Sequence, residues 1–336
     1  MNLKTFKRKS ITVSSENLVT TNFLESTQQL PLVIQPAVDG VNLVSWASSN
    51  RDWIEKQLIQ YGGLLFRNFP INTHSEFANF MQAVAGELIE YSYRSTPRSQ
   101  VDGKIYTSTE YPPDQSIPSH NEMAYCLNWP MKIAFFCVKA AEQGGETPIA
   151  DSRKVFQRID PKIKEQFIQK KIMYVRNYGQ GIDLPWETVF QTNDKAEVEA
   201  YCQSTGIDFT WLDVNKLRTR QVCQAVATHP QTGDLVWFNQ AHLFHISSLK
   251  AEVRQSLLAV LNSEELPRNS YYGDASEIEI SVLEEIQAIY EQETVTFSWQ
   301  EGDILLLDNM LVAHGRKPFT GARKVLVGMA QPYSNK

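Results

Sequence analysis

The most constraining feature of this chain is a histidine and a glutamate one residue apart, followed far downstream by another histidine. His120 and Glu122 flank Asn121, and His314 comes just after a strongly apolar stretch near the end of the chain. Residues i and i+2 of a β-strand point to the same face, so a strand here lets His120 and Glu122 bind one metal ion. The third ligand then comes from elsewhere, and His314 is the candidate, which requires a fold that brings distant segments together.

Two imidazoles and one carboxylate on one face of a metal suit ferrous iron and leave the other positions open for a co-substrate and O₂. A His-x-Glu tripeptide also occurs by chance, so an ordinary surface or core histidine is the simple alternative for His120. Two further features favour the metal site. Arg316 and Arg323 lie close to His314 and can bind a carboxylate, and a Gly-Gly-Glu-Thr segment at 144–147 lies one strand beyond the ligand pair.

The composition is that of an ordinary globular protein. The chain has 336 residues, of which 42% are hydrophobic and 21% charged, and this suits one large domain or two modest ones. Its net charge is −6 and it contains no basic block, which argues against nucleic acid as a partner. No apolar stretch resembles a signal peptide or a membrane span, so we expect a cytoplasmic protein.

The cysteines are few and scattered, and none belongs to a Cys-x-x-Cys pair of the kind found in zinc ribbons or thioredoxin-like motifs. This usage fits a reducing compartment. We therefore expect four buried or inert thiols, at Cys126, Cys137, Cys202 and Cys223.

Many short β-like runs with glycine and proline turns, together with early and central helices, predict a mostly-β protein with helical additions. The expected core is a double-stranded β-helix, a cupin-like jelly roll built from two sheets. Residues 1–30 are polar and are expected to form a loosely ordered N-terminal arm. Residues 31–336 are expected to form a single jelly-roll domain with a helical insertion at about 150–290. Within it we expect helices over 152–171 and 185–204.

Taken in order, several segments resemble the TauD/TfdA (taurine dioxygenase) superfamily of Fe(II)- and 2-oxoglutarate-dependent oxygenases. The likeness is greatest to the SyrP-like branch associated with non-ribosomal peptide biosynthesis, which includes aspartyl hydroxylases. The segments span residues 60–330, nearly the whole chain, and the set is far more specific than any one member. They are residues 62–69, 118–123, 144–147, 229–240 and 308–323.

The resemblance implies that His120, Glu122 and His314 are the iron ligands. Many members of the family have aspartate where this chain has Glu122, and glutamate is a known variant. A carboxylate at this position argues against the halogenating relatives, in which a small residue leaves a coordination position for halide.

The resemblance also implies a site for 2-oxoglutarate as co-substrate. The hydroxyl group of Thr147 is expected to contact it, and Arg323 is expected to pair with its distal carboxylate. Arginine suits this role because its planar guanidinium binds a carboxylate through two parallel hydrogen bonds. Arg316 and Lys324 are alternative carboxylate binders, because spacing in this segment varies between branches.

Candidate substrate contacts are Asn121, Trp237 and Asn239, together with the polar segment 91–98, in which Arg94 or Arg98 can pair with a substrate carboxylate. Each has an ordinary alternative. Aromatic residues at alternating strand positions are more often core, and arginines in a loop are more often exposed. His229, which precedes Pro230 in a turn, is expected at the surface.

The implied reaction is hydroxylation of an unactivated C–H bond of an amino acid, free or tethered to a carrier protein, in natural-product biosynthesis. It consumes O₂ and 2-oxoglutarate and forms succinate and CO₂. Relatives use the same cofactors for desaturation or oxidative rearrangement. Two other classes stay open, a non-catalytic jelly roll that binds a small acid and a hydrolase or isomerase with zinc at the same ligands.

Overall fold

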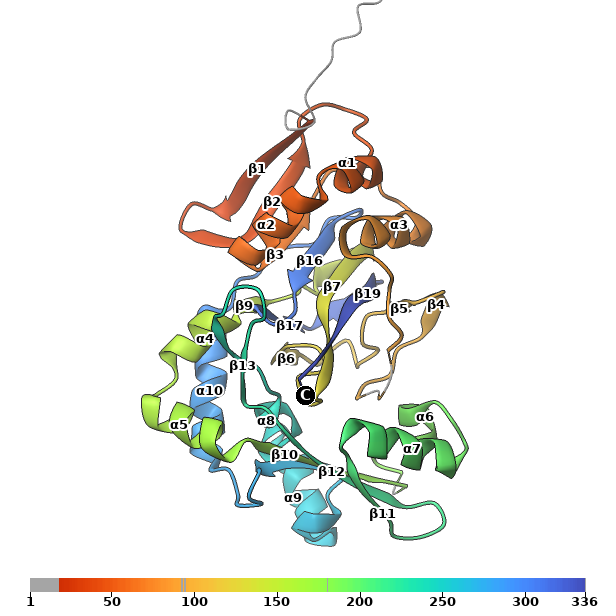
Figure 1. Ribbon diagram of the computed structural model, residues 1–336, viewed down its shortest axis with the longest axis vertical. Helices are drawn as coiled ribbons and strands as arrows, with labels where there is room; N and C mark the ends of the chain where they lie inside the picture. The colour runs from red at the N-terminus through yellow and green to blue at the C-terminus, as the bar shows by residue number, and fades with distance from the viewer. Residues whose placement is uncertain (1–17, 92, 94, 180, 336) are drawn as a thin grey trace, which may run out of the picture.

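An eight-stranded sheet runs through the middle of the molecule (Figure 1). The computed structural model describes residues 18–91, 93, 95–179 and 181–335. The order of the strands in this sheet is β1-β2-β3-β16-β7-β19-β5-β4. They are β1 (Val19–Glu25), β2 (Gln28–Pro36), β3 (Gly63–Phe66), β4 (Gln100–Asp102), β5 (Ile105–Thr107), β7 (Asn128–Lys139), β16 (Ile304–Asp308) and β19 (Lys324–Ser334).

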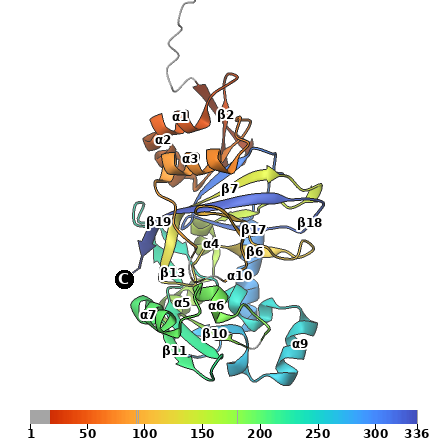
Figure 2. The same ribbon diagram turned by 90° about the vertical axis from the view of Figure 1, so that its right-hand side faces the viewer.

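Strand β16 lies between β3 and β7, and all five of its residues are buried. A continuous apolar run of this kind is typical of a strand that is covered on both faces. Helices α1 (Leu43–Ser49), α2 (Arg51–Tyr61) and α3 (His74–Ala85) cover one face of the large sheet (Figure 2). The contact between Phe77 of α3 and Phe136 of β7, with ring centroids 5.4 Å apart, belongs to this layer.

A smaller sheet of order β6-β17-β9 lies on the other side of the large sheet (Figure 2). Its strands are β6 (Ile117–His120), β17 (Val312–Arg316) and β9 (Ile149–Asp151), and a short pair of β8 (Gln143–Gly144) with β18 (Phe319–Thr320) accompanies it. Strand β17 lies in the centre and is buried along its whole length. The space between the two sheets holds the site described below.

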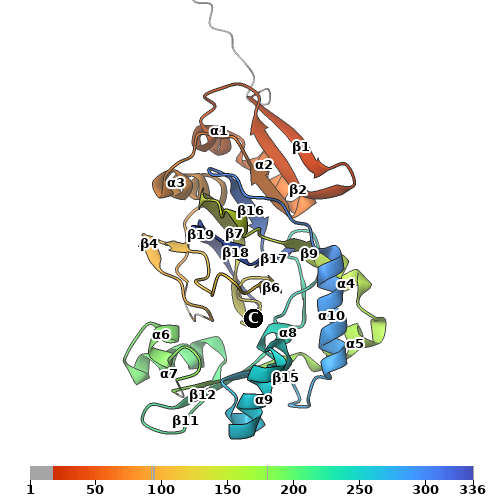
Figure 3. The same cartoon turned by 180° about the vertical axis from the view of Figure 1, so that it is seen from behind.

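A large insertion lies between β9 and β16 and packs beside and below the sheets (Figures 1 and 3). Its helices are α4 (Ser152–Arg158), α5 (Pro161–Lys170), α6 (Trp186–Phe190), α7 (Lys195–Thr205), α8 (Ala241–Phe244), η2 (Ile246–Ser248), α9 (Ala251–Val260), η3 (Ser263–Glu265) and α10 (Ile280–Glu293). Its strands are β10 (Ile172–Tyr178), β11 (Asp208–Trp211), β12 (Leu217–Cys223), β13 (Val226–Thr228), β14 (Leu235–Trp237) and β15 (Arg268–Tyr272).

The insertion differs from the helical one expected, because it carries its own four-stranded sheet of order β11-β12-β10-β15. The helix expected over 152–171 is two helices. Asp160 caps the second one with its side chain and Pro161 occupies its first turn, where a missing N–H group costs nothing. The helix expected over 185–204 is also two, because Gln191 adopts a left-handed conformation (φ 57°) and Asp194 caps the next helix.

The prediction of a loosely ordered arm over residues 1–30 is wrong for residues 18–30, the part of it that the structure describes. Polar β1 pairs with β2, and β2 pairs in parallel with β3, so this segment extends the large sheet. An edge strand needs to bury only one side, which is why a polar, threonine-rich sequence can form it.

The cysteines match the expectation, since all four are buried and none forms a disulfide. Burial raises the pKa of each thiol, to about 12 for Cys137, so these groups are protonated and unreactive at neutral pH. Within the part of the chain that the structure describes, no helix is both long and apolar enough to cross a membrane.

Candidate metal centre

The two histidines of the predicted triad are direct neighbours across two antiparallel strands. His120 ends β6, His314 lies in the middle of β17, and the pairing register places them opposite each other. Their ring centroids are 4.7 Å apart, and the ring of Phe135 from the large sheet packs at 4.9 Å from that of His314. The strand pairing therefore unites residues that are far apart in the sequence.

Glu122 reaches the same place from the turn that follows β6, and not from the strand itself. The prediction that His120 and Glu122 share one strand face is therefore wrong, because β6 ends at His120. The turn is held by Asn309, whose side-chain oxygen accepts from the backbone N–H of Glu122 at 2.7 Å. The Asn309 amide donates to the Glu122 carbonyl at 2.9 Å.

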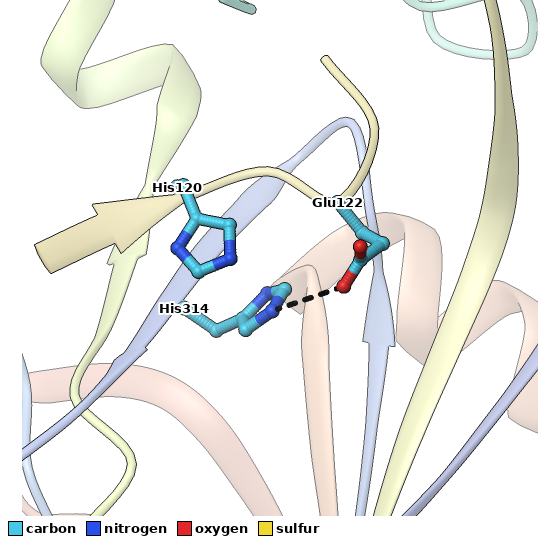
Figure 4. A group of neighbouring side chains, drawn as sticks. All are labelled: His120, Glu122 and His314. Atoms are coloured by element: carbon cyan, nitrogen blue, oxygen red, sulfur yellow. Dashed lines mark ion pairs between the residues drawn. The ribbon is translucent and has the colours of Figure 1, made fainter. Parts of the chain in front are cut away.

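The three side chains converge on one point (Figure 4). One donor atom from each lies within 4.8 Å of the others, and His314 Nε2 is 3.9 Å from Glu122 Oε2. His120 Nδ1 is 2.9 Å from the carbonyl of Pro118, so it donates there and leaves Nε2 with a free lone pair. Burial lowers the pKa of both His120 and His314 and keeps the rings neutral, as metal ligation requires. This donor set fits a divalent metal ion.

The pocket beside these residues holds the groups expected to bind 2-oxoglutarate. Thr147 is buried, and its hydroxyl oxygen accepts from the indole N–H of Trp299 at 3.1 Å, so its own hydrogen is free to donate to a ligand. The pocket is lined by Arg98, Ser108, Thr109, Ile117, His120, Phe135, Thr147, His314, Gly315, Arg316 and Arg323.

Arg323 reaches this pocket across a glycine pair. Its Nε donates to the carbonyl of Gly145 at 2.9 Å, and Nη1 is 3.4 Å from the hydroxyl of Ser108. A Cβ atom at position 145 would lie 2.9 Å from Cδ of Arg323, and Gly145 has φ +73°, so glycine is needed here on both counts. Burial and the nearby Arg316 lower the pKa of Arg323 to about 10, so the side chain stays charged at neutral pH.

The alternative carboxylate binders are placed differently. Arg316 lines the pocket, but its two terminal nitrogens donate to the carbonyls of Tyr111, Pro112 and Gln115 at 2.6–2.9 Å. Lys324 begins β19 with an exposed side chain and does not line the pocket. Of the three cations, Arg323 therefore has the most suitable position.

Of the candidate substrate contacts, Arg98 lines the pocket, whereas Asn121, Trp237 and Asn239 do not. Asn121 is fully buried and donates to Ser152 and to the carbonyl of Asn309. Trp237 packs on Phe167 in the core, with ring centroids 5.0 Å apart. The Asn239 side chain bridges the carbonyl of Ala225 and the N–H of Ala241. None of the three lines the pocket, and Arg94 lies outside the described residues.

Several residues that support the site were not predicted, because their partners are distant in sequence: Asn309, Trp299, and the pairing of Arg98 with Glu122. His229, expected at the surface, is fully buried and lies 3.0 Å from a carboxylate oxygen of Asp308. Its turn packs inward, and the side chain ties the β13–β14 hairpin to the end of β16.

The sequence is similar to a known protein family and to individual proteins. Residues 26–330 match the family model described as "Taurine catabolism dioxygenase TauD, TfdA family". The dapdiamide synthesis protein DdaC of Enterobacter agglomerans is 43% identical over 310 residues, which cover 89% of this chain and 94% of that protein. A clavaminate synthase-like protein of Arabidopsis thaliana is 30% identical over 299 residues, which cover 84% and 86%.

The fold is also similar to that of solved structures. PvcB from Pseudomonas aeruginosa superposes with a TM-score of 0.55 over 98% of both chains, at 14% identity. A further structure of PvcB has a TM-score of 0.54 and describes that protein as an Fe, alpha-ketoglutarate dependent oxygenase from an isonitrile synthetic pathway. At this level of identity the likeness concerns the fold.

Proposed function

The chain belongs to the TauD/TfdA family of dioxygenases, and on that premise we propose that it is an Fe(II)- and 2-oxoglutarate-dependent hydroxylase. The observation that carries the proposal is the convergence of His120, Glu122 and His314 beside a pocket that also contains Thr147 and Arg323. A zinc hydrolase has no need of a hydroxyl group and a guanidinium poised for a dicarboxylate. A non-catalytic binding protein has no need of the complete ligand set.

In this proposal each group of side chains has a separate role. His120, Glu122 and His314 would hold the iron. Thr147 would contact 2-oxoglutarate through its hydroxyl group, and Arg323 would pair with the distal carboxylate of 2-oxoglutarate. Phe135 would keep water from the inner side of the site. The bound iron and 2-oxoglutarate supply the oxidation by O₂ that yields succinate and CO₂ and transfers an oxygen atom to the substrate. The protein contributes rigid ligand geometry and a dry pocket.

The finer fold assignment is part of the same proposal. The large sheet faces the smaller β6-β17-β9 sheet across the metal ligands (Figure 2). This two-sheet arrangement supports a cupin-like double-stranded β-helix with the site between its sheets.

For the substrate we propose an amino acid, free or tethered to a carrier protein, in natural-product biosynthesis. The support is the 43% identity to a protein whose name assigns it to dapdiamide synthesis. Desaturation or oxidative rearrangement of a small carboxylate is the alternative with the same cofactors. The mass of the product separates hydroxylation from desaturation, since hydroxylation adds one oxygen atom and desaturation removes two hydrogen atoms.

The test is succinate formation from 2-oxoglutarate by the iron-loaded protein, with oxygen uptake recorded in parallel. We expect His120→Ala to reduce succinate to background, because one of three ligands is lost. His74→Ala is the matched control, since His74 is an exposed histidine that pairs with Asp102 on the surface. Succinate formation by the His120 variant at the rate of the unmodified protein would remove the basis of the proposal.

A further inference from the structure

Arg98 is a buried cation on the wall of the pocket that the roles above do not use. Its Nη2 donates to Glu122 Oε2 at 2.6 Å, and each side chain of this pair is only 3% exposed. The guanidinium also lies over the ring of Tyr91, 4.6 Å from the centroid. Arg98 is therefore held firmly beside a metal ligand, with its position fixed by both an ion pair and a ring.

Two nitrogens of the Arg98 guanidinium donate no hydrogen bond within the described residues. Nε and Nη1 are buried and have no hydrogen-bond partner among the described residues. Buried polar groups are nearly always paired, and an unpaired donor on a charged group is especially unfavourable. Arg323 differs because its Nε donates to the carbonyl of Gly145. Arg316 differs because both of its terminal nitrogens donate to carbonyl groups of the chain and only its Nε lacks a partner among the described residues. The unused donors of Arg98 therefore indicate an acceptor that comes from outside the chain.

The charges around the pocket indicate the kind of acceptor. Three arginines line it, and Glu122 is the only carboxylate among the lining residues and the triad. A divalent metal ion and dianionic 2-oxoglutarate cancel each other in charge, so the loaded site keeps an excess of positive charge. Such a site attracts a further anion.

We propose that Arg98 is a substrate-binding residue that accepts a carboxylate of the primary substrate through its unused donors while it holds Glu122. This inference rests on the proposed function and narrows its substrate class. An amino acid tethered as a thioester has lost its α-carboxylate. The subsite therefore favours a free amino acid or a tethered one with a carboxylate side chain.

The experiment uses a matched pair of probes, N-acetylglycine and its neutral amide N-acetylglycinamide. Each is titrated anaerobically into the protein loaded with Fe(II) and 2-oxoglutarate, and binding is followed by the change of the visible charge-transfer band and by calorimetry. The variant is Arg98→Gln. Arg67→Gln is the control, because Arg67 forms an equally short pair with buried Asp303, at 2.6 Å, away from the pocket, and is itself only 13% exposed.

We expect the unmodified protein and the Arg67 variant to bind the acid at least about tenfold more tightly than the amide, as a charge-assisted hydrogen bond implies. Arg98→Gln should bring the two affinities together. If this variant fails to fold, Arg98→Lys serves instead, since it keeps the charge without the planar donors and should reduce the preference to about threefold.

Three results would overturn the inference. The first is the lack of a preference for the acid in the unmodified protein, including no binding of the acid. The second is a preference that stays undiminished in Arg98→Gln or, where that variant does not fold, in Arg98→Lys. The third is loss of the charge-transfer band on addition of the acid. The last would mean that the acid displaces 2-oxoglutarate. If the unmodified protein with Fe(II) and 2-oxoglutarate shows no charge-transfer band before any probe is added, the result would instead contradict the proposed function.

Discussion

Asn309 holds both backbone polar groups of Glu122, with its side-chain oxygen 2.7 Å from the N–H and its nitrogen 2.9 Å from the carbonyl. Asn309 is fully buried, donates also to the carbonyl of Pro130, and lies five residues before His314. One side chain thus connects the turn that carries the carboxylate ligand to the segment that carries the second histidine.

Replacing Asn309 with alanine should weaken metal binding about 10- to 100-fold, the usual effect of losing a group that orients a ligand. Calorimetric titration with Mn(II) measures this. Asn177→Ala is the control, because the Asn177 amide also donates to two backbone carbonyls but lies in the insertion. An equal loss of Mn(II) affinity in both variants would mean that Asn309 acts only through general stability.

Arg323→Ala should raise the concentration of 2-oxoglutarate needed for half-maximal succinate formation about tenfold or more, because a charge-assisted pair to the distal carboxylate is lost. Lys324→Ala is the neighbouring control, since Lys324 is exposed. If the requirement stays unchanged in the Arg323 variant, another cation must bind this carboxylate.

Arg316→Ala should affect stability more than co-substrate affinity. Its side chain donates to three carbonyl groups between Tyr111 and Gln115, and removing it leaves these acceptors without their charged donor. We expect a loss of about 2–4 kcal/mol in the free energy of unfolding, measured by urea denaturation. A fully stable Arg316 variant that needs a higher concentration of 2-oxoglutarate for half-maximal succinate formation would reverse the roles assigned to Arg316 and Arg323.

The metal-free protein should lose stability as the pH falls below about 6.5. Burial lowers the pKa of His242 to about 4, and it also lowers those of His120 and His314. Between the folded and unfolded pKa values the unfolded chain binds more protons, so acid favours unfolding in that window. His242 alone contributes about 1.4 kcal/mol per pH unit between about 6.5 and 4.

His242→Gln checks this assignment, because the glutamine amide can still donate to the carbonyl of Ser119, which His242 Nε2 contacts at 3.0 Å. Urea denaturation at pH 7 and pH 5 should show a smaller loss of stability for the variant than for the unmodified protein. Equal losses would mean that folding does not lower the pKa of His242.

The sequence was sufficient to single out three side chains that the fold brings together, His120, Glu122 and His314, because their identities and order are distinctive. It was not sufficient for the geometry that positions them. Glu122 was expected on a strand, since spacing alone cannot reveal that β6 ends at His120. Asn121 was expected to face the substrate, but its amide is committed to Ser152 and to the carbonyl of Asn309.

The supporting contacts could not be predicted because they join segments that only the fold brings together. Trp299 donates to Thr147 across 152 positions of sequence, and His229 meets Asp308 across 79. Helix breaks at Pro161 and Asp194 were visible as local signals, yet apolar periodicity on both sides masked them. Local rules therefore predicted helical segments without their breaks, and tertiary pairing decided the surroundings of the site.

The most direct test of the central claim is the visible spectrum of the metal-free protein after anaerobic addition of Fe(II) and 2-oxoglutarate. The account predicts a weak charge-transfer band that requires both additions and is absent when Glu122 is replaced by alanine. A normally folded protein without such a band, or a band that is unchanged in the Glu122 variant, would contradict the assignment of His120, Glu122 and His314 as the iron site.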